Sequence, residues 1–469
     1  MSLFSDSRDL IGYAGRPPDP KWPGKARICL QFVINYEEGG ENNILYGDAA
    51  SEAFLSEIVG AQAWPSMRHM SMESIYEYGS RAGFWRLWRI FGERKLPVTV
   101  FGIATALMRN REAVAAMKAA GWEIAGHGLK WIDYKDFAPE EERAHMREAI
   151  RIHTQVVGER PLGWYTGRTS EHTLRLVMEE GGFLYSADSY ADDLPYWIDG
   201  PNGPQLVTPY TLDANDMRFA TPQGFNSGDQ FYAYLKDSFD VLYAEGATSP
   251  KMMSVGLHCR LAGRPGRTAA LMRFLDYVSA HERVWVARRI DVARHWITHH
   301  RPPDLRPSSM NRALFVELYG DIFERSAWVA EGAFAAGLTS AQDGSEGLHQ
   351  ALTSVLRLAD REQKLALIRA HPDLAGRLKL ATMTQDSQRE QGAAGLERLT
   401  EEERGRFLEL NESYKEKFGF PFVMAVKLRS KDEILSAFEE RLQNDPQQEF
   451  ERALEEIEMI ALLRLKDRL

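Results

Sequence analysis

One histidine, one carboxylate and two amide or hydroxyl side chains lie close together in the C-terminal third of the chain. They are His371, Ser387, Glu390 and Gln391. Because the last three stand at i, i+3 and i+4, a helix would place them on one face. His371 precedes Pro372, which keeps the histidine extended and can begin a helix. No metal-binding motif accompanies these residues, so the pattern predicts acid–base chemistry performed by side chains alone.

The same spacing also has a structural interpretation, because Ser-x-x-Glu is a capping box and proline is common in a first helical turn. The last predicted helix supplies an independent indication. Its spacing places on one inward stripe the residues Phe450, Leu454, Ile457, Ala461 and Arg464. A cation on an apolar face needs a nearby anion or a route to water. Arg464 therefore either binds an anionic substrate or reaches solvent past the end of the helix.

Four motifs in this region occur in order: HPDLAG from His371, SxxEQxxAGL from Ser387, LNESYKEKFGFPFVMAV from Leu410 and EEIEMIALLRL from Glu455. With them, the chain from about Asn311 onward resembles the 2-oxo-4-hydroxy-4-carboxy-5-ureidoimidazoline (OHCU) decarboxylases of urate breakdown. The resemblance implies an all-α domain that converts OHCU into (S)-allantoin. It implies no cofactor, because the electrons left behind by CO₂ delocalise into the substrate's own imine and carbonyl groups.

The resemblance also implies roles for the polar residues. His371 is the expected acid–base residue, with a pKa near neutrality that a neighbouring Glu390 would raise. Arg464 is expected to contact the anionic substrate. The remaining expected substrate contacts are Pro372, the side chains of Ser387 and Gln391, and backbone groups of Phe422 and Val423.

In the first 300 residues, polar side chains follow several short apolar runs. Glu37 and Glu38 follow one run, and His127 and His258 follow two others. The carboxyl ends of parallel strands are where βα folds place their chemistry. Each residue alone could belong to a solvated turn or a strand cap, but their recurrence favours an active site.

The apolar runs predict buried strands at 27–34, 97–103, 122–125, 251–257 and 284–286, separated by helical stretches. This alternation favours an α/β fold with parallel strands that close into a barrel. Three prolines between residues 301 and 310 predict a linker, and helical periodicity dominates after it. We therefore expect an α/β domain at 1–300 and an all-α domain at 311–469, joined by the linker 301–310.

The N-terminal motifs are NYEEGGE, GHGLKWIDY, RPLGWYTGR, SYADDLPYW and GLHCRLAGRPGR. From about Arg8 to Trp296 they resemble the polysaccharide deacetylase superfamily and, within it, the allantoinase branch. The resemblance implies a deformed (β/α) barrel and the hydrolytic opening of allantoin, a hydantoin, to allantoate. Metal-dependent members carry a His-x-x-x-His pair, whereas here His127 is followed by Trp131. Since an indole offers no usable lone pair, we expect no metal.

Without a metal, a side chain must activate water. By resemblance, Glu37 falls on the base position of the family and Glu38 on a metal-ligand position. We expect Glu37 to be the base, with a pKa raised by Glu38 and by partial burial, and His127 is the alternative. His127 and His258 would polarise the carbonyl group or protonate the leaving nitrogen.

Other side chains of the N-terminal motifs could hold the substrate. Arg168, or alternatively Arg160, would bind the ureido or carbonyl oxygens. Trp131, Trp164 and Tyr165 are aromatic residues of the kind that usually pack in a core. A flat hydantoin would nevertheless suit stacking against one of them.

The bulk properties of the chain limit its partners. A length of 469 residues suggests two domains, and a net charge of −10 argues against nucleic acid. Cys29 and Cys259 cannot form a disulfide framework, which favours a reducing compartment. The first residues lack the features of a signal peptide, and no apolar run is long enough to span a membrane. We expect a cytoplasmic protein.

Together these observations predict one chain that performs two consecutive reactions on small molecules, without cofactors, and that forms a homo-oligomer. Two alternatives remain. The N-terminal domain could be a metal-dependent deacetylase or another amidohydrolase. The helical domain could be a non-catalytic oligomerisation module, with His371 and Glu390 serving only as helix punctuation.

Overall fold

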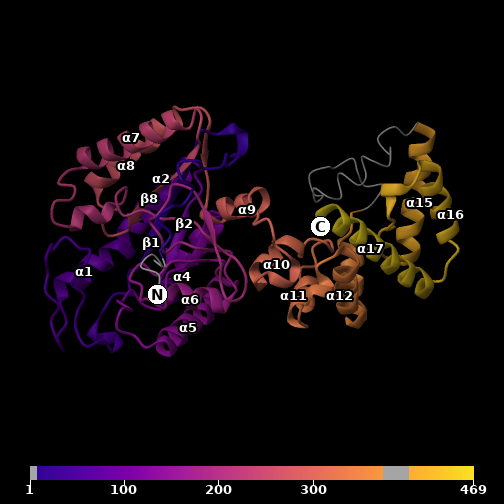
Figure 1. Cartoon of the computed structure of the whole chain (residues 1–469), viewed down its shortest axis with the longest axis horizontal. Helices are drawn as coiled ribbons and strands as arrows, with labels where there is room; N and C mark the ends of the chain where they lie inside the picture. Colours follow the sequence, from indigo (N-terminus) through magenta and orange to yellow (C-terminus); the bar gives the residue numbers. More distant parts are fainter. Residues whose placement is uncertain (1–7, 373–400) are drawn as a thin grey trace, which may run out of the picture. The chain divides into compact units, whose positions relative to one another are not determined.

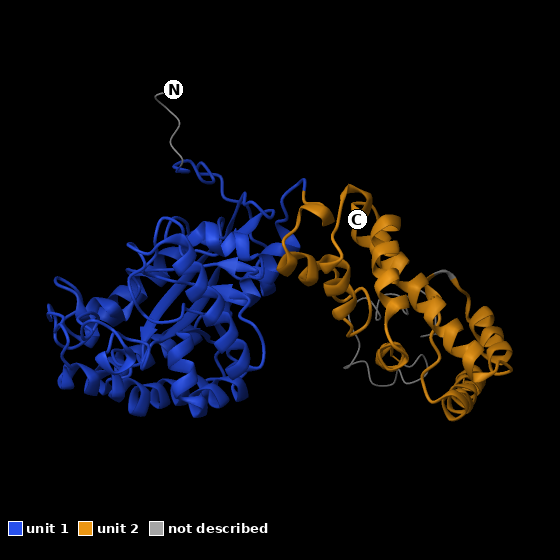
Figure 2. Cartoon of the chain, turned by 90° about the horizontal axis from the view of Figure 1, so that it is seen from below, with its two compact units in different colours: residues 1–304 blue, residues 305–469 orange. Residues whose placement is uncertain are grey.

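The computed structural model describes residues 8–372 and 401–469. The chain divides into two compact units, Met1–Asp304 and Leu305–Leu469, shown in two colours in Figure 2. Within the described residues, no helix is long and apolar enough to cross a membrane.

The N-terminal unit is built on a nine-stranded sheet. Its strands are β1 (Ile28–Tyr36), β2 (Thr99–Gly102), β3 (Glu123–Gly126), β4 (Gly163–Trp164), β5 (Tyr185–Ser186), β6 (Tyr196–Ile198), β7 (Gln205–Val207), β8 (Lys251–His258) and β9 (Val284–Val286). The strand order is β6-β7-β5-β4-β3-β2-β1-β8, and all pairs are parallel except β6 with β7. β9 pairs with the first half of β1, and β2 pairs with its second half. This curled, mostly parallel sheet confirms the predicted deformed barrel.

Helices cover the outside of the sheet (Figure 1). They are α1 (Met70–Tyr78), α2 (Phe84–Glu93), α3 (Ala104–Arg109), α4 (Arg111–Ala119), α5 (Pro139–Val157), α6 (Thr173–Glu180), α7 (Gly228–Glu245), α8 (Pro265–Ser279) and α9 (Arg289–His299). Every residue of β1 is buried, which explains why its sequence is largely apolar. Phe32 of β1 packs against Phe91 of α2 and Phe274 of α8, with ring centroids 5.2 and 6.4 Å apart.

A single π-helical turn, η3 (Gly79–Gly83), joins α1 to α2 beside the carboxyl end of β1. A Cβ on Gly79 would lie 2.4 Å from Oε1 of Glu38, and a Cβ on Gly83 would lie 2.0 Å from the carbonyl oxygen of Cys259. Only glycine permits these approaches. The turn therefore lets Glu38 and the loop after β8 pack closely together.

The described part of the C-terminal unit is helical, as predicted. Its α-helices are α10 (Arg312–Tyr319), α11 (Trp328–Ala335), α12 (Ser345–Leu358), α13 (Arg361–Ala370), α15 (Glu401–Phe418), α16 (Lys431–Arg441) and α17 (Pro446–Arg468). All five residues of the predicted stripe on α17, from Phe450 to Arg464, are buried. α17 packs against α12, α13 and α15, and so forms the centre of the unit.

Candidate active sites

The polar residues predicted at the strand ends do converge in the N-terminal unit. Glu37 and Glu38 follow β1, His127 follows β3, and His258 ends β8. The register pairs Asn35 of β1 with His258 of β8, so parallel strands bring these ends to one edge of the sheet. All four side chains are buried. The alternative of a solvated turn at Glu37 and Glu38 is therefore wrong.

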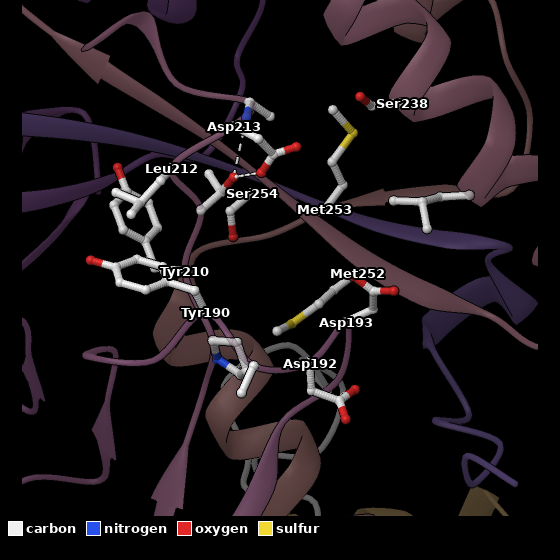
Figure 3. A pocket seen from close by; sticks show the side chains of 15 residues that line it. Tyr190, Asp192, Asp193, Tyr210, Leu212, Asp213, Ser238, Met252, Met253 and Ser254 are labelled. Carbon is white, nitrogen blue, oxygen red and sulfur yellow. Dashed lines mark hydrogen bonds between the residues drawn. The ribbon is translucent and has the colours of Figure 1, made fainter. Parts of the chain in front are cut away.

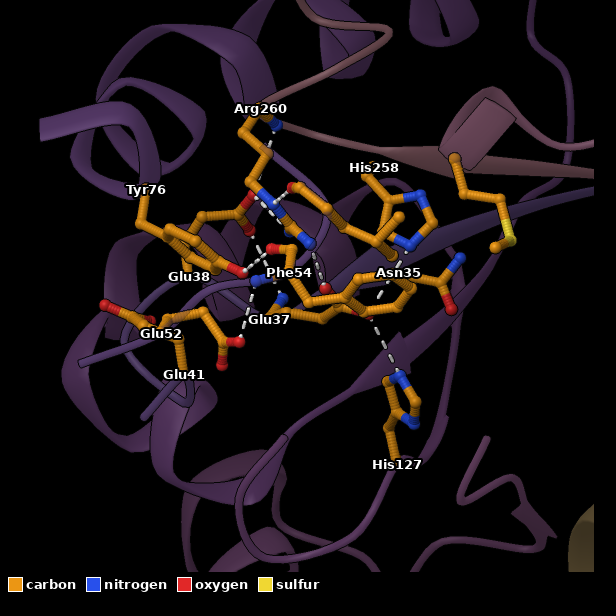
Figure 4. Close-up of polar contacts among 12 residues, drawn as sticks. Asn35, Glu37, Glu38, Glu41, Glu52, Phe54, Tyr76, His127, His258 and Arg260 are labelled. Atoms are coloured by element: carbon orange, nitrogen blue, oxygen red, sulfur yellow. Dashed lines mark hydrogen bonds and ion pairs between the residues drawn. The ribbon is translucent and has the colours of Figure 1, made fainter. Parts of the chain in front are cut away.

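Glu37 lies at the centre of this cluster (Figure 4). Its Oε1 is 3.3 Å from Nε2 of His127 and 3.4 Å from Nε2 of His258. Its Oε2 accepts a hydrogen bond of 2.6 Å from Nη2 of Arg260. One carboxylate thus contacts two imidazoles and one guanidinium, an arrangement able to exchange protons with a bound molecule.

The pKa of Glu37 differs from the value expected from the sequence. Burial alone would raise its pKa, but the Arg260 guanidinium and His258 outweigh burial and hold the pKa of Glu37 well below its ordinary value. The expected rise is therefore wrong, and Glu37 is ionised at neutral pH. The pKa of Glu38 is raised, chiefly by burial.

His258 is held by a carboxylate that the sequence motifs did not indicate. Its Nδ1 lies 2.6 Å from Oδ1 of Asp216, and its backbone N–H donates to Oδ2 of Asp216. Burial lowers the pKa of His258, but the carboxylates of Glu37 and Asp216 outweigh burial and raise it to about 9. His258 therefore carries a positive charge at neutral pH.

Asp216 begins the short helix η4 (Asp216–Ala220), which Asn215 caps. Its Oδ2 also accepts a hydrogen bond of 2.8 Å from the backbone of Ala262. Asp216 lies in none of the five N-terminal motifs, and no local pattern predicts its role. Arg260 was also missed, although it stands inside the quoted motif GLHCRLAGRPGR, two residues after His258.

Trp131 and Arg168 form a wall beside this cluster. Trp131 is buried, and the guanidinium of Arg168 lies 3.9 Å from its ring centroid. Arg168 also approaches Oε1 of Glu52 at 3.8 Å and lines a cavity of about 830 Å³ together with Phe54. This cavity gives Arg168 access to a small molecule. Arg160, the alternative, instead binds Glu180 at 2.8 Å.

The other two aromatic candidates have packing roles. Trp164 belongs to a buried apolar cluster beneath α5 and α6. The Tyr165 ring stacks on His127, with centroids 5.0 Å apart, and its backbone carbonyl lies 3.1 Å from Nδ1 of the same histidine. Tyr165 therefore orients His127.

A second cavity of about 520 Å³ lies beside β8 (Figure 3). Its acidic lining residues are Asp192, Asp193 and Asp213, and Tyr210 also lines it. The hydroxyl of Tyr210 accepts a hydrogen bond of 2.9 Å from Asn35 of β1. The cavity contains none of the predicted site residues.

A divalent metal does not fit the Glu37 cluster. Trp131 offers no ligand atom, and the buried Arg260 guanidinium already contacts both Glu37 and Glu38. Among the described residues, no group of three or more His, Cys, Asp or Glu side chains is arranged to hold an ion.

In the C-terminal unit, His371 caps the end of α13 and is buried, and Pro372 follows it half-buried. Nδ1 of His371 lies 3.0 Å from the carbonyl oxygen of Leu367. Burial lowers the pKa of His371 to about 4, and the positive charge of nearby Arg464 acts in the same direction. The Leu367 carbonyl and the Glu324 carboxylate act to raise this pKa, but burial outweighs them. The expected near-neutral pKa is therefore wrong. Ser387, Glu390 and Gln391 lie outside the described residues.

Arg464 is buried rather than extended to water, so the solvent alternative is wrong. Both of its terminal nitrogens lie 3.2 Å from Oε2 of Glu324, and Nη1 donates to the carbonyl of Ile322 at 3.1 Å. The stripe on α17 thus ends in a buried ion pair. Glu324 lies outside the four C-terminal motifs, which do not predict it.

Phe422 and Val423 lie in a buried segment between α15 and α16. Nη1 of Arg441 donates to the carbonyl of Val423 at 2.8 Å, and the guanidinium lies 4.4 Å from the Phe422 ring centroid. Glu449 balances the charge of Arg441 at 2.6 Å. Arg441 therefore holds the backbone that was predicted to bind substrate.

Comparison with known proteins assigns each unit. The polysaccharide deacetylase family matches residues 68–183, and the OHCU decarboxylase family matches residues 308–466. A putative polysaccharide deacetylase of Schizosaccharomyces pombe is 41% identical over 315 residues, which are 63% of this chain and 98% of that protein. An OHCU decarboxylase of Halalkalicoccus jeotgali is 42% identical over 164 residues, 35% of this chain and 89% of that protein. The chain belongs to both families.

A solved structure refines the N-terminal assignment. The crystal structure of Puue allantoinase is 62% identical, with a TM-score of 0.63, and the match covers 63% of this chain and 99% of that one. The predicted fusion of an allantoinase-like unit with an OHCU decarboxylase unit is therefore confirmed.

Proposed function

We propose that this chain catalyses two consecutive steps of urate breakdown. The C-terminal unit decarboxylates OHCU to (S)-allantoin, and the N-terminal unit hydrolyses allantoin to allantoate. The observation that carries the proposal is the presence, in one chain, of units similar to Puue allantoinase and to OHCU decarboxylases. The product of one proposed reaction is the substrate of the other.

In the N-terminal unit, the Glu37–His127 pair takes a proton from water, whose oxygen adds to a ring carbonyl carbon of allantoin. Glu37 is ionised, as a base must be, and His127 lies 3.3 Å away to share the proton. The carbon–nitrogen bond of the ring then breaks. His258 is protonated, and its Nε2–H faces Glu37, so it can donate a proton to the leaving nitrogen.

Arg168 and Trp131 hold the substrate in this scheme. A guanidinium that is stacked on an indole has its edge free to donate hydrogen bonds to ureido or carbonyl oxygens. Burial raises the pKa of Glu38, whose carboxyl oxygens accept hydrogen bonds from the backbone N–H groups of Glu37 and Arg260. The two carboxyl groups therefore play different parts.

In the C-terminal unit, His371 acts as a base. The Leu367 carbonyl can only accept a hydrogen bond, so Nδ1 carries the proton and Nε2 of the neutral ring is left as the acceptor. Nε2 takes the hydroxyl proton of OHCU, the bond to the carboxylate carbon breaks, and CO₂ leaves. A proton then returns to the neighbouring ring carbon. Arg464, whose charge acts on His371, binds the substrate anion.

The test is to supply the purified chain with freshly generated OHCU, and to follow optical activity and allantoate together. Glu37→Gln should produce (S)-allantoin and stop there. His371→Ala should fail to speed the decay of OHCU but should still hydrolyse added allantoin. If either variant retains the step assigned to it, the corresponding site is wrong.

A second candidate function is kept for the N-terminal unit, because the yeast relative is named a putative polysaccharide deacetylase. Hydrolysis of N-acetylated oligosaccharides, lost on chelation and restored by zinc, would favour it. We expect no such hydrolysis, because Trp131 and Arg260 leave no place for the ion.

A further inference from the structure

The guanidinium of Arg260 is fully enclosed in the N-terminal cluster, with 0% of its side chain exposed. It lies 2.6 Å from Glu37 and 3.5 Å from Glu38. Its Nε donates to the carbonyl of Leu55 at 2.7 Å, and its backbone N–H donates to Glu38 at 3.1 Å. Arg260 thus bridges both carboxyl groups of the pair.

Aromatic rings complete the enclosure. The guanidinium carbon lies 4.3 Å from the ring centroid of Tyr76 and 5.1 Å from that of Trp131. Both rings offer their π electrons to a cation. Trp131, which replaces a metal-binding histidine, therefore packs directly against the charge that balances Glu37 and Glu38.

Two adjacent buried carboxyl groups require a positive charge nearby. A guanidinium supplies it permanently, because arginine does not lose its proton in proteins. A divalent ion bound by Glu38 and His127 would lie beside this charge and be repelled by it. Two separate features therefore act against metal: the missing ligand at Trp131 and the cation at Arg260.

We propose that Arg260 is the built-in cation of this site, which occupies the place a divalent metal would need and keeps Glu37 and Glu38 in position. Arg260 is a positioning residue, because it acts through the two carboxyl groups. The inference about metal does not depend on which substrate the site hydrolyses.

The test is zinc binding by the full chain, measured by equilibrium dialysis and elemental analysis. Trp131→His restores the missing ligand type but should not bind zinc, because Arg260 is still present. Adding Arg260→Met, which removes the charge and keeps most of the volume, should allow about one zinc ion per chain. Adding Arg260→Lys instead retains the charge and should again prevent binding.

Two controls locate the effect. Glu38→Gln, added to the Trp131→His/Arg260→Met protein, should abolish the binding, which shows that the ion is in this pocket. Circular dichroism checks that each protein is folded, and Arg260→Gln replaces the methionine variant if that variant does not fold. Stoichiometric zinc binding by Trp131→His alone would overturn the proposal. A folded Trp131→His/Arg260→Met protein that binds no zinc would also overturn it.

Discussion

The two candidate sites of this chain each contain a buried histidine, but only one of the two histidines is charged at neutral pH. His258 faces the carboxylates of Glu37 and Asp216, and its pKa is raised to about 9. His371 is enclosed to a similar degree, next to the Leu367 carbonyl and the Arg464 guanidinium, and its pKa is lowered to about 4. Burial favours the neutral form in both cases, and only close carboxylates reverse it.

This difference suits the two reactions. Ring hydrolysis needs a proton for a leaving nitrogen, which a charged histidine supplies. Decarboxylation of OHCU begins with loss of a hydroxyl proton, which a neutral histidine accepts. In the proposed scheme the same residue type is an acid in one unit and a base in the other, and changes to its neighbours should reveal this.

The largest effect should come from Asp216→Asn, which removes one of the two carboxylates that keep His258 charged. We expect allantoin hydrolysis to fall by roughly 10²–10⁴-fold, and the alkaline limb of its pH profile to move below 9. OHCU decarboxylation should be unchanged. Asp192→Asn, which alters an acidic residue of the separate cavity, is the control. An unchanged alkaline limb would contradict the role given to Asp216.

The next largest effect should be on stability. Glu324→Gln leaves the buried Arg464 without the carboxylate that lies 3.2 Å away. We expect the C-terminal unit to lose about 3 kcal/mol of unfolding free energy, because removing one partner of a buried ion pair is costly. Denaturant unfolding measures this loss. Glu331→Gln breaks the more exposed pair with Arg312 and should cost under about 1 kcal/mol.

The unmodified chain should show different pH limits for its two activities. Allantoin hydrolysis should decline as the pH rises through about 9, where His258 loses its proton. Decarboxylation should persist as the pH falls toward about 4, where His371 gains a proton. Profiles of kcat/KM for each substrate measure both limits. If the acidic limb of the decarboxylation profile lies near pH 6.5, the ordinary pKa of histidine, then burial does not lower the pKa of His371.

The same shifts affect stability with opposite signs. The pKa of His258 is raised in the folded state, so its contribution is complete below about 6.5 and is lost as the pH rises through about 9. The pKa of His371 is lowered, so its contribution is complete above about 6.5 and is lost as the pH falls toward about 4. His258→Gln should remove the loss of stability at alkaline pH and leave the loss at acidic pH unchanged, as measured by thermal melting at several pH values.

The smallest effect should come from Arg168→Lys. An ammonium group cannot stack on Trp131 and donate a paired set of hydrogen bonds at once. We expect KM for allantoin to rise by roughly tenfold with little change in kcat, because binding rather than proton transfer is affected. Arg160→Lys, at the Glu180 pair, should leave KM unchanged. A fall in kcat alone would place Arg168 in the chemical step instead.

Sequence reasoning located the residues that follow strands and missed their partners. Glu37, His127 and His258 were predicted because each follows an apolar run, which is a local signal. Asp216 reaches His258 across 42 residues and Arg260 reaches Glu37 across 223. Such contacts leave no periodic pattern in the chain. The pKa of Glu37 was therefore predicted in the wrong direction.

The C-terminal unit shows the same limit. The stripe ending at Arg464 was readable from helical spacing, and its burial is confirmed. Whether Arg464 reaches solvent or meets an anion depended on Glu324, 140 residues away. The homo-oligomer and the cytoplasmic location stay predictions.

The sequence by itself determined the strands β1, β2, β3, β8 and β9, the helical character of the C-terminal unit and the candidate side chains, because apolar spacing and short motifs are properties of neighbouring residues. Only the tertiary structure decided the charge on each reactive group. That charge depends on burial and on the nearest ions, and folding brings those ions from distant parts of the chain.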